Sequence, residues 1–99
     1  MKIEVTAVRL ITPKDTGLRG FADVKLDDIL VRDFRIFHRH GSHYVQSPHS
    51  SFKRDGQIVF TPIVELPEEL RMHVNAQIIS AFLREKEKKD ESASQSTGK

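Results

Sequence analysis

The chain contains no cysteine and no tryptophan, and it has only five glycines and four prolines. Without cysteine there is no disulfide framework, no thiol nucleophile and no thiolate metal site. No apolar run approaches the ~20 residues that a membrane-spanning helix needs. Glu4 interrupts the N-terminal stretch in which a secretion signal requires continuous apolar residues. We therefore expect a cytoplasmic protein with no membrane partner.

The composition is that of one small globular domain. Of the 99 residues, 37% are hydrophobic and 30% are charged, and a chain of this length builds one modest core. The net charge of +2 is unevenly distributed. Five of the six charged residues from Arg32 to Arg54 are basic, whereas acidic residues outnumber basic ones from Asp55 onward. The central segment is therefore the electropositive part of the chain. Such clustering suggests an anionic partner, but charge alone favours the alternative of a solvated strand face with ordinary surface arginines.

The most informative stretch is Gly17 to Ile36, which has two runs of period-2 alternation separated by Asp27-Asp28. This pattern predicts a β-hairpin. In the first run, alternate small and apolar residues from Leu18 to Leu26 share one face. In the second run, strict alternation places Leu30, Arg32, Phe34 and Ile36 on one face, with aromatic and basic residues on both faces.

The rest of the chain predicts three more strands and one helix. We expect strands at 2–11 (with a bulge near Ala7-Val8), 43–46 and 57–61, a loop over 47–56, and a helix from about Pro67 to Lys88. Pro67-Glu68-Glu69 is a typical first helical turn, with carboxylates beside the positive end of the dipole.

The predicted fold class is α+β: an antiparallel five-stranded sheet with one C-terminal α-helix, in a single domain of residues 1–89 followed by a disordered polar tail at 90–99. One helix covers one face of such a sheet. We therefore expect a homodimer that pairs through the sheet, either by an unpaired edge strand or face to face.

Candidate catalytic groups are weak. His38, His40 and His43 are close in sequence, but the Gly41-Ser42 break redirects the chain between them and no cysteine completes a zinc set. Asp27-Asp28 is typical of a turn rather than of paired catalytic carboxylates. We expect no enzyme, no metal, no cofactor and no small-molecule substrate.

Nucleic-acid binding is better supported by the residues. Arginines that alternate with phenylalanines on a strand provide phosphate contacts beside a stacking surface. Phe34 itself is expected to pack in the core. The candidate contacts are Lys53 and Arg54 in the predicted loop, Arg35 on the strand and Arg84 near the end of the helix.

The order of these motifs resembles the stage V sporulation protein G family of bacterial septation proteins. The resemblance is carried by Thr6–Leu10, Leu26–Ile36, the segment Ser47–Gly56, the Pro62-Ile63 pair and the helix from Pro67. It implies a small dimeric α+β regulator of septation and sporulation that binds DNA and RNA through its basic loop and helix.

Two departures from the family pattern concern the binding loop. His49-Ser50-Ser51 stands where basic residues usually follow the Pro-Ser pair, and apolar Ile58-Val59-Phe60 replaces a charged pair after Asp55-Gly56. The alternative function is a protein-interaction module whose edge strand or phenylalanine-rich face recruits a cell-division or regulatory partner without nucleic acid.

Overall fold

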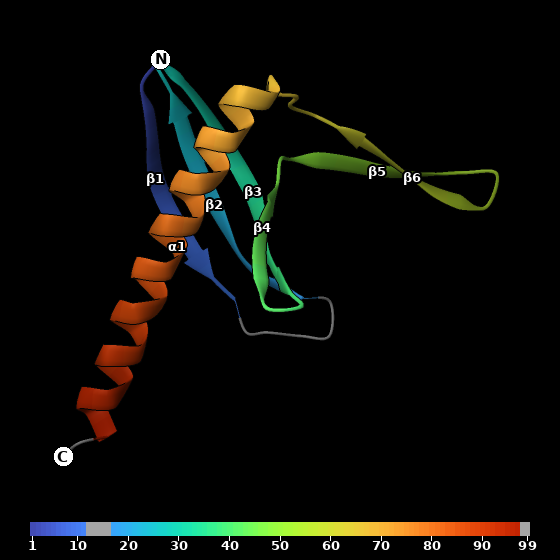
Figure 1. Cartoon of the computed structure of the whole chain (residues 1–99). Coiled ribbons are helices and arrows are strands. Elements are labelled where there is room, and N and C mark those ends of the chain that lie inside the picture. Colours follow the sequence, from blue (N-terminus) through green and yellow to red (C-terminus); the bar gives the residue numbers. More distant parts are fainter. Residues whose placement is uncertain (12–16, 98–99) are drawn as a thin grey trace.

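Four strands form a continuous antiparallel sheet in the order in which they follow one another along the chain (Figure 1). The computed structural model describes residues 1–11 and 17–97, with side chains described up to Lys89. The predicted turn between the two central strands is confirmed: Asp27 adopts a φ of 53°, a left-handed conformation that aspartate tolerates better than most residues. The strands are β1 (Ile3–Leu10), β2 (Leu18–Leu26), β3 (Ile29–Arg39) and β4 (Ser42–Gln46).

Three shifts in strand register, one between β1 and β2 and two between β2 and β3 (at Leu18/Gly20 and Ala22/Val24), affect which side chains face the core. The pairing of β1 with β2 shifts between Val5 and Ala7, just before the position predicted from the sequence. A second shift separates Ala22 from Val24 where β2 pairs with β3, and Asp33 there has a φ of 65°. An extra residue in one strand breaks the period-2 alternation.

The bulge at Asp33 corrects the alternation expected for β3. Val31 packs against the core before the bulge, whereas Phe34 and Ile36 are buried after it. Strict alternation places Val31 on the face opposite Phe34, and that expectation is wrong because the bulge reverses the phase of the strand. The burial of Phe34, at 1% exposure, confirms that it is a core residue.

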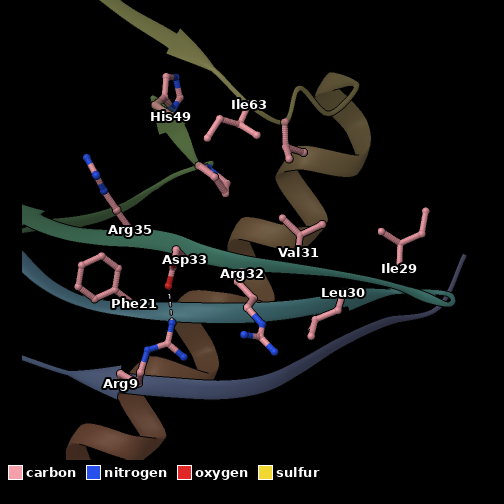
Figure 2. Close-up of a pocket in the computed structure, with 12 residues that line it drawn as sticks. Arg9, Phe21, Ile29, Leu30, Val31, Arg32, Asp33, Arg35, His49 and Ile63 are labelled. Carbon is pink, nitrogen blue, oxygen red and sulfur yellow. Dashed lines mark hydrogen bonds and ion pairs between the residues drawn. The ribbon is translucent and has the colours of Figure 1, made fainter. Parts of the chain in front are cut away.

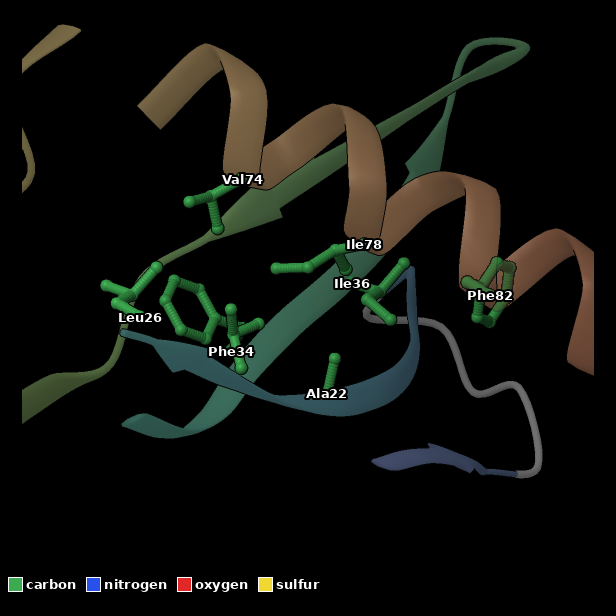
Figure 3. Close-up of a cluster of buried hydrophobic side chains, with 8 residues drawn as sticks. Ala22, Leu26, Phe34, Ile36, Val74, Ile78 and Phe82 are labelled. Atoms are coloured by element: carbon green, nitrogen blue, oxygen red, sulfur yellow. The ribbon is translucent and has the colours of Figure 1, made fainter. Parts of the chain in front are cut away.

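The core lies between one face of this sheet and the helix α1 (Glu68–Thr97) (Figure 3). From the helix come Val74, Ile78 and Phe82, spaced so that they lie on one side of it. Burying a side chain of this size contributes about 1.5–3 kcal/mol each. The sheet contributes Ala22, Val24, Leu26, Phe34 and Ile36.

The helix starts where the sequence predicts, directly after Pro67, with Glu68 and Glu69 in its first turn. It continues beyond Lys88, the expected end, to Thr97. The division into a domain of residues 1–89 and a polar tail stays a prediction. Within the described residues, no helix is both long enough and apolar enough to cross a membrane.

A separate two-stranded hairpin, called here the arm, projects from the sheet (Figure 1). It consists of β5 (His49–Arg54) and β6 (Gln57–Pro62), which pair only with each other. The expected loop over 47–56 is therefore wrong for most of its length. The expected five-stranded sheet is also wrong: the structure has a four-stranded sheet and the two-stranded arm. Pairing with β6 gives Ser50 and Ser51 the strand conformation that their own composition does not favour.

Candidate nucleic-acid interface

The face of the four-stranded sheet opposite the helix, called here the outer face, carries aromatic and basic side chains. Side chains alternate along each strand, so the neighbours of buried Ala22, Phe34 and Ile36 point to this face. Strand register places Phe21 directly between Arg9 on β1 and Arg35 on β3. These three residues form one row across three strands.

Arg9 is neutralised by carboxylates at its end of the row. Its guanidinium donates hydrogen bonds of 2.8 and 2.9 Å to the two carboxylate oxygens of Asp23, and one of 2.7 Å to Oδ1 of Asp33. The hydrogen bond with Asp23 is the main cause that raises the pKa of Arg9, and the same bond lowers the pKa of Asp23. A guanidinium held in this bidentate way is a structural group rather than a free phosphate contact.

Arg35 differs from Arg9 because it forms no ion pair with any described residue. It is half-buried on β3. The next outward position on the same strand is Phe37, which pairs with Tyr44 on β4. The rings of Phe37 and Tyr44 stack with centroids 5.1 Å apart and planes 11° apart. Tyr44 was not predicted as a site residue from the sequence, although its alternation with core-facing Val45 was a usable signal.

An open groove of ≈ 750 Å³ lies between this part of the sheet and the base of the arm (Figure 2). Phe21, Arg32 and Arg35 line it from the sheet, and His49 and Ile63 line it from the arm side. The groove therefore has apolar, aromatic and cationic walls, together with the carboxylate of Asp33, which is bound by Arg9. Such walls suit a ligand that combines flat rings with negative charge.

The tip of the arm carries the basic pair predicted from the sequence. Lys53 pairs with Ile58 and Arg54 with Gln57 across the hairpin, and both cations are exposed. The turn residues Asp55 and Gly56 have φ values of 52° and 79°, as a tight two-residue hairpin turn requires. Neither Lys53 nor Arg54 forms an ion pair with a described residue.

The four predicted contacts occupy three separate places in one copy of the chain. Lys53 and Arg54 lie at the arm tip, and Arg35 lies on the outer face near the arm base. Arg84 is exposed on α1, close to Val5 on β1, which is the other side of the sheet. A single copy does not gather these charges into one patch.

Two of the five histidines, His38 and His43, stack on each other. The rings of His38 and His43 lie 4.3 Å apart on the helix side of the sheet, and His43 also contacts Phe82 with centroids 5.5 Å apart. Burial is the main cause that lowers the pKa of His43. Among the described residues, no group of three or more histidines and carboxylates is arranged to hold a metal ion.

Comparisons with family models, with curated proteins and with solved structures found no match. The resemblance to the stage V sporulation protein G family, with its role in septation and sporulation, therefore stays a prediction. The function is inferred from the residues described above.

Proposed function

We propose that the protein is a non-enzymatic, homodimeric regulator that binds DNA and RNA, with the arm tip as its principal phosphate contact. The observation that carries this proposal is the position of Lys53 and Arg54, exposed and without ion pairs to described residues, at the end of a projecting two-stranded ribbon. A two-stranded β-ribbon has the size to enter the major groove of a duplex. Arginine and lysine there neutralise phosphates.

The homodimer is supported by the apolar side chains of the arm. Phe60 and Ile58, at 62% and 60% exposure, lie on one face of the hairpin, and Phe52, at 47%, lies on the other. An isolated two-stranded hairpin is at best marginally stable in water. We propose that a second copy covers the arm and so stabilises it. The pairing through a sheet that the sequence predicts would then take place at the two-stranded arm.

Dimerisation also increases the positive charge that the arm tips together present to a polyanion. Two cations and the neighbouring Asp55 leave each tip with one net positive charge. A dimer presents two tips to the same polyanion, and the second contact then forms at a high effective concentration. Arg35 adds a contact near the arm base, and Arg84 stays a proposed contact from the helix side.

The test is a titration of labelled duplex DNA and of RNA at several salt concentrations, followed by fluorescence anisotropy. For the double variant Lys53→Ala/Arg54→Ala we expect weaker binding, and a salt dependence that is flatter by ~0.9 for each phosphate that the variant no longer neutralises. The matched control is Lys88→Ala/Lys89→Ala, which removes two adjacent cations from the helix. Equally weakened binding by both double variants contradicts the arm assignment.

Arg35→Gln and Arg84→Gln test the other two contacts in the same titration. If the wild-type protein binds neither polymer at low salt, nucleic-acid binding is refuted. A partner protein recovered in its place then supports the interaction module.

A further inference from the structure

The outer face of the sheet carries a second feature that phosphate binding by the arm does not use, namely the stacked pair of Phe37 and Tyr44. Tyr44 is 43% exposed although it is a large aromatic side chain. One face of its ring lies against Phe37, with the two planes nearly parallel. Among the described strands, none follows β4 in the sheet order, so no strand covers the second face of the tyrosine ring.

We propose that this outer face is a binding surface for single-stranded nucleic acid, with an unpaired base stacked on Tyr44 and its phosphates held by Arg35. The base becomes the third ring of the stack that Phe37 and Tyr44 begin. This inference rests on the proposed function and deepens it, because it names the form of the nucleic acid and a recognition surface apart from the arm tip.

The charges beside the stack favour a polyanion. Arg35 and Arg39 flank Phe37 on the same strand and the same face. Among the described carboxylates on this face, Asp23 and Asp33 lie toward the other end and are both held by Arg9, and Glu4 lies farther along β1 opposite Lys25. The end of the face that holds the aromatic pair therefore carries Arg35, which has no ion pair with a described residue, and it continues into the groove lined by Phe21, Arg35 and His49.

The stacking requirement selects single strands over duplexes. In a duplex the base faces are already stacked on one another, whereas unpaired bases are free to stack on protein aromatic rings. Such stacking tolerates every base, because each base has a flat face. The proposal therefore includes no sequence preference.

The same charges disfavour a second copy of the chain on this surface. A twofold dimer brings the same patch of both copies together. Here that would bring the two copies of Arg35 into the same interface, and a cation desolvated there without a partner carboxylate is costly. A dimer through the arm leaves the outer face open for the nucleic acid.

Tyr44 is itself the probe for the test, because the chain has one tyrosine and no tryptophan. Its intrinsic fluorescence reports on this one position in the full-length, unlabelled protein. We propose titrating the protein with an oligothymidylate and with an abasic oligonucleotide of the same length, which has the phosphates but no bases. The expected result is quenching by the oligothymidylate and not by the abasic strand.

Affinity measurements with labelled strands complete the test. Replacing the ring by Tyr44→Leu should weaken binding of the oligothymidylate about tenfold, with little change for duplex DNA, and Tyr44→Phe should bind as the wild type does. If Tyr44→Leu fails to fold, the Tyr44→Trp variant repeats the quenching experiment with excitation at wavelengths where the bases absorb little.

Three outcomes overturn the inference. If single strands bind without quenching the tyrosine fluorescence, and bind Tyr44→Leu as tightly as the wild type, the stacking site is refuted. The proposed function is not affected by that result. Absence of binding to any nucleic acid removes both. Tyrosine emission that depends on protein concentration alone, together with dissociation of the dimer in Tyr44→Leu, shows that a second copy covers this face.

Discussion

The backbone N–H of Asp33 donates a hydrogen bond of 3.1 Å to Oδ1 of Asp23 on the neighbouring strand. This carboxylate is nearly buried and also accepts two of the three hydrogen bonds that the guanidinium of Arg9 donates. It therefore joins β1, β2 and the bulge of β3. The bulge depends on a side chain from another strand rather than on its own residues alone.

Replacing Asp23 by asparagine should destabilise the fold. The amide keeps the shape of the side chain but removes the negative charge and one of the acceptors that serve Arg9 and the Asp33 N–H. Since charge-assisted hydrogen bonds contribute more than neutral ones, we expect a decrease of about 1–2 kcal/mol in the free energy of unfolding, measured by urea denaturation. The control is Asp28→Asn in the exposed turn, whose free energy of unfolding should stay within about 0.5 kcal/mol of the wild-type value. Equal decreases in both variants would show that Asp23 has no special role.

Gly20→Ala should be among the most damaging small substitutions in the sheet. A Cβ at this position would lie 2.6 Å from the backbone oxygen of Arg9, and a backbone atom has little room to move. We expect a destabilisation of about 3 kcal/mol from this overpacking. Gly41→Ala is the comparison, because a Cβ there meets open space and only the φ of 78° is unfavourable, at a cost of about 1 kcal/mol. Thermal denaturation of both variants shows which substitution costs more stability. A Gly20→Ala variant that is more stable than Gly41→Ala would contradict the close approach of β1 and β2.

The protein should lose stability as the pH falls below 6.5. Burial lowers the pKa of His43 from its ordinary 6.5, and the positive charges of His38, Lys86 and Arg19 lower it further. The unfolded chain then binds a proton at a pH where the folded chain does not, so acid favours unfolding. The stabilisation is fully present above pH 6.5 and disappears as the pH falls toward the lowered pKa of the folded state.

Substitution of His43 separates this effect from general acid sensitivity. For His43→Gln we expect a shallower fall in the free energy of unfolding between pH values of about 7 and 5. The exposed helix residue His73 supplies the control His73→Gln, which should follow the wild-type curve. Unfolding by urea at each pH gives the measurement. Identical slopes for all three proteins would rule out His43 as the responsible group.

The arm offers a direct test of the proposed dimer. Phe60→Lys places a charge at an apolar position of the hairpin that is 62% exposed in the single chain. If a second copy covers that position, the substitution buries an unpaired cation and the dimer should dissociate at least tenfold more readily. Sedimentation equilibrium measures the dissociation constant. Met72→Lys is the matched control, since Met72 on the helix is 64% exposed. A monomeric wild-type protein would contradict the dimer itself.

Much of the fold follows from the sequence because local patterns agree with the tertiary structure. The alternation in β2 from Gly20 to Leu26, the Asp27-Asp28 turn and the start of the helix after Pro67 are each determined by residues close in sequence, whereas the register shift at Leu18 was not predicted. The strand β5 could not be predicted in this way, because serines and a histidine adopt strand conformation there only through pairing with β6. The bulge at Asp33 was also missed, since the carboxylate that holds it comes from Asp23 on another strand.

For the candidate site, the sequence indicated residue types better than positions. Exposed cations at Lys53 and Arg54 agree with the expectation, and Phe34 is a core residue as expected. The separation of Arg35 from Arg84 by the full thickness of the sheet depends on strand register and helix placement. The stack of Phe37 with Tyr44 depends on the register between β3 and β4, which no local pattern encodes.

The extra residue in β3 is the one place where this strand can change in length without exchanging its two faces. Residues on the turn side of Asp33 and residues beyond it follow opposite alternations, and each half satisfies its own neighbours. Removing Asp33 alone would give a regular strand in which Val31, Phe34 and Ile36 all still face the helix, at the cost of the hydrogen bonds that Asp33 makes with Asp23 and Arg9. Homologous chains that keep this architecture should therefore tolerate loss of this one residue more readily than an insertion or deletion within either half of the strand, which would turn core side chains toward water.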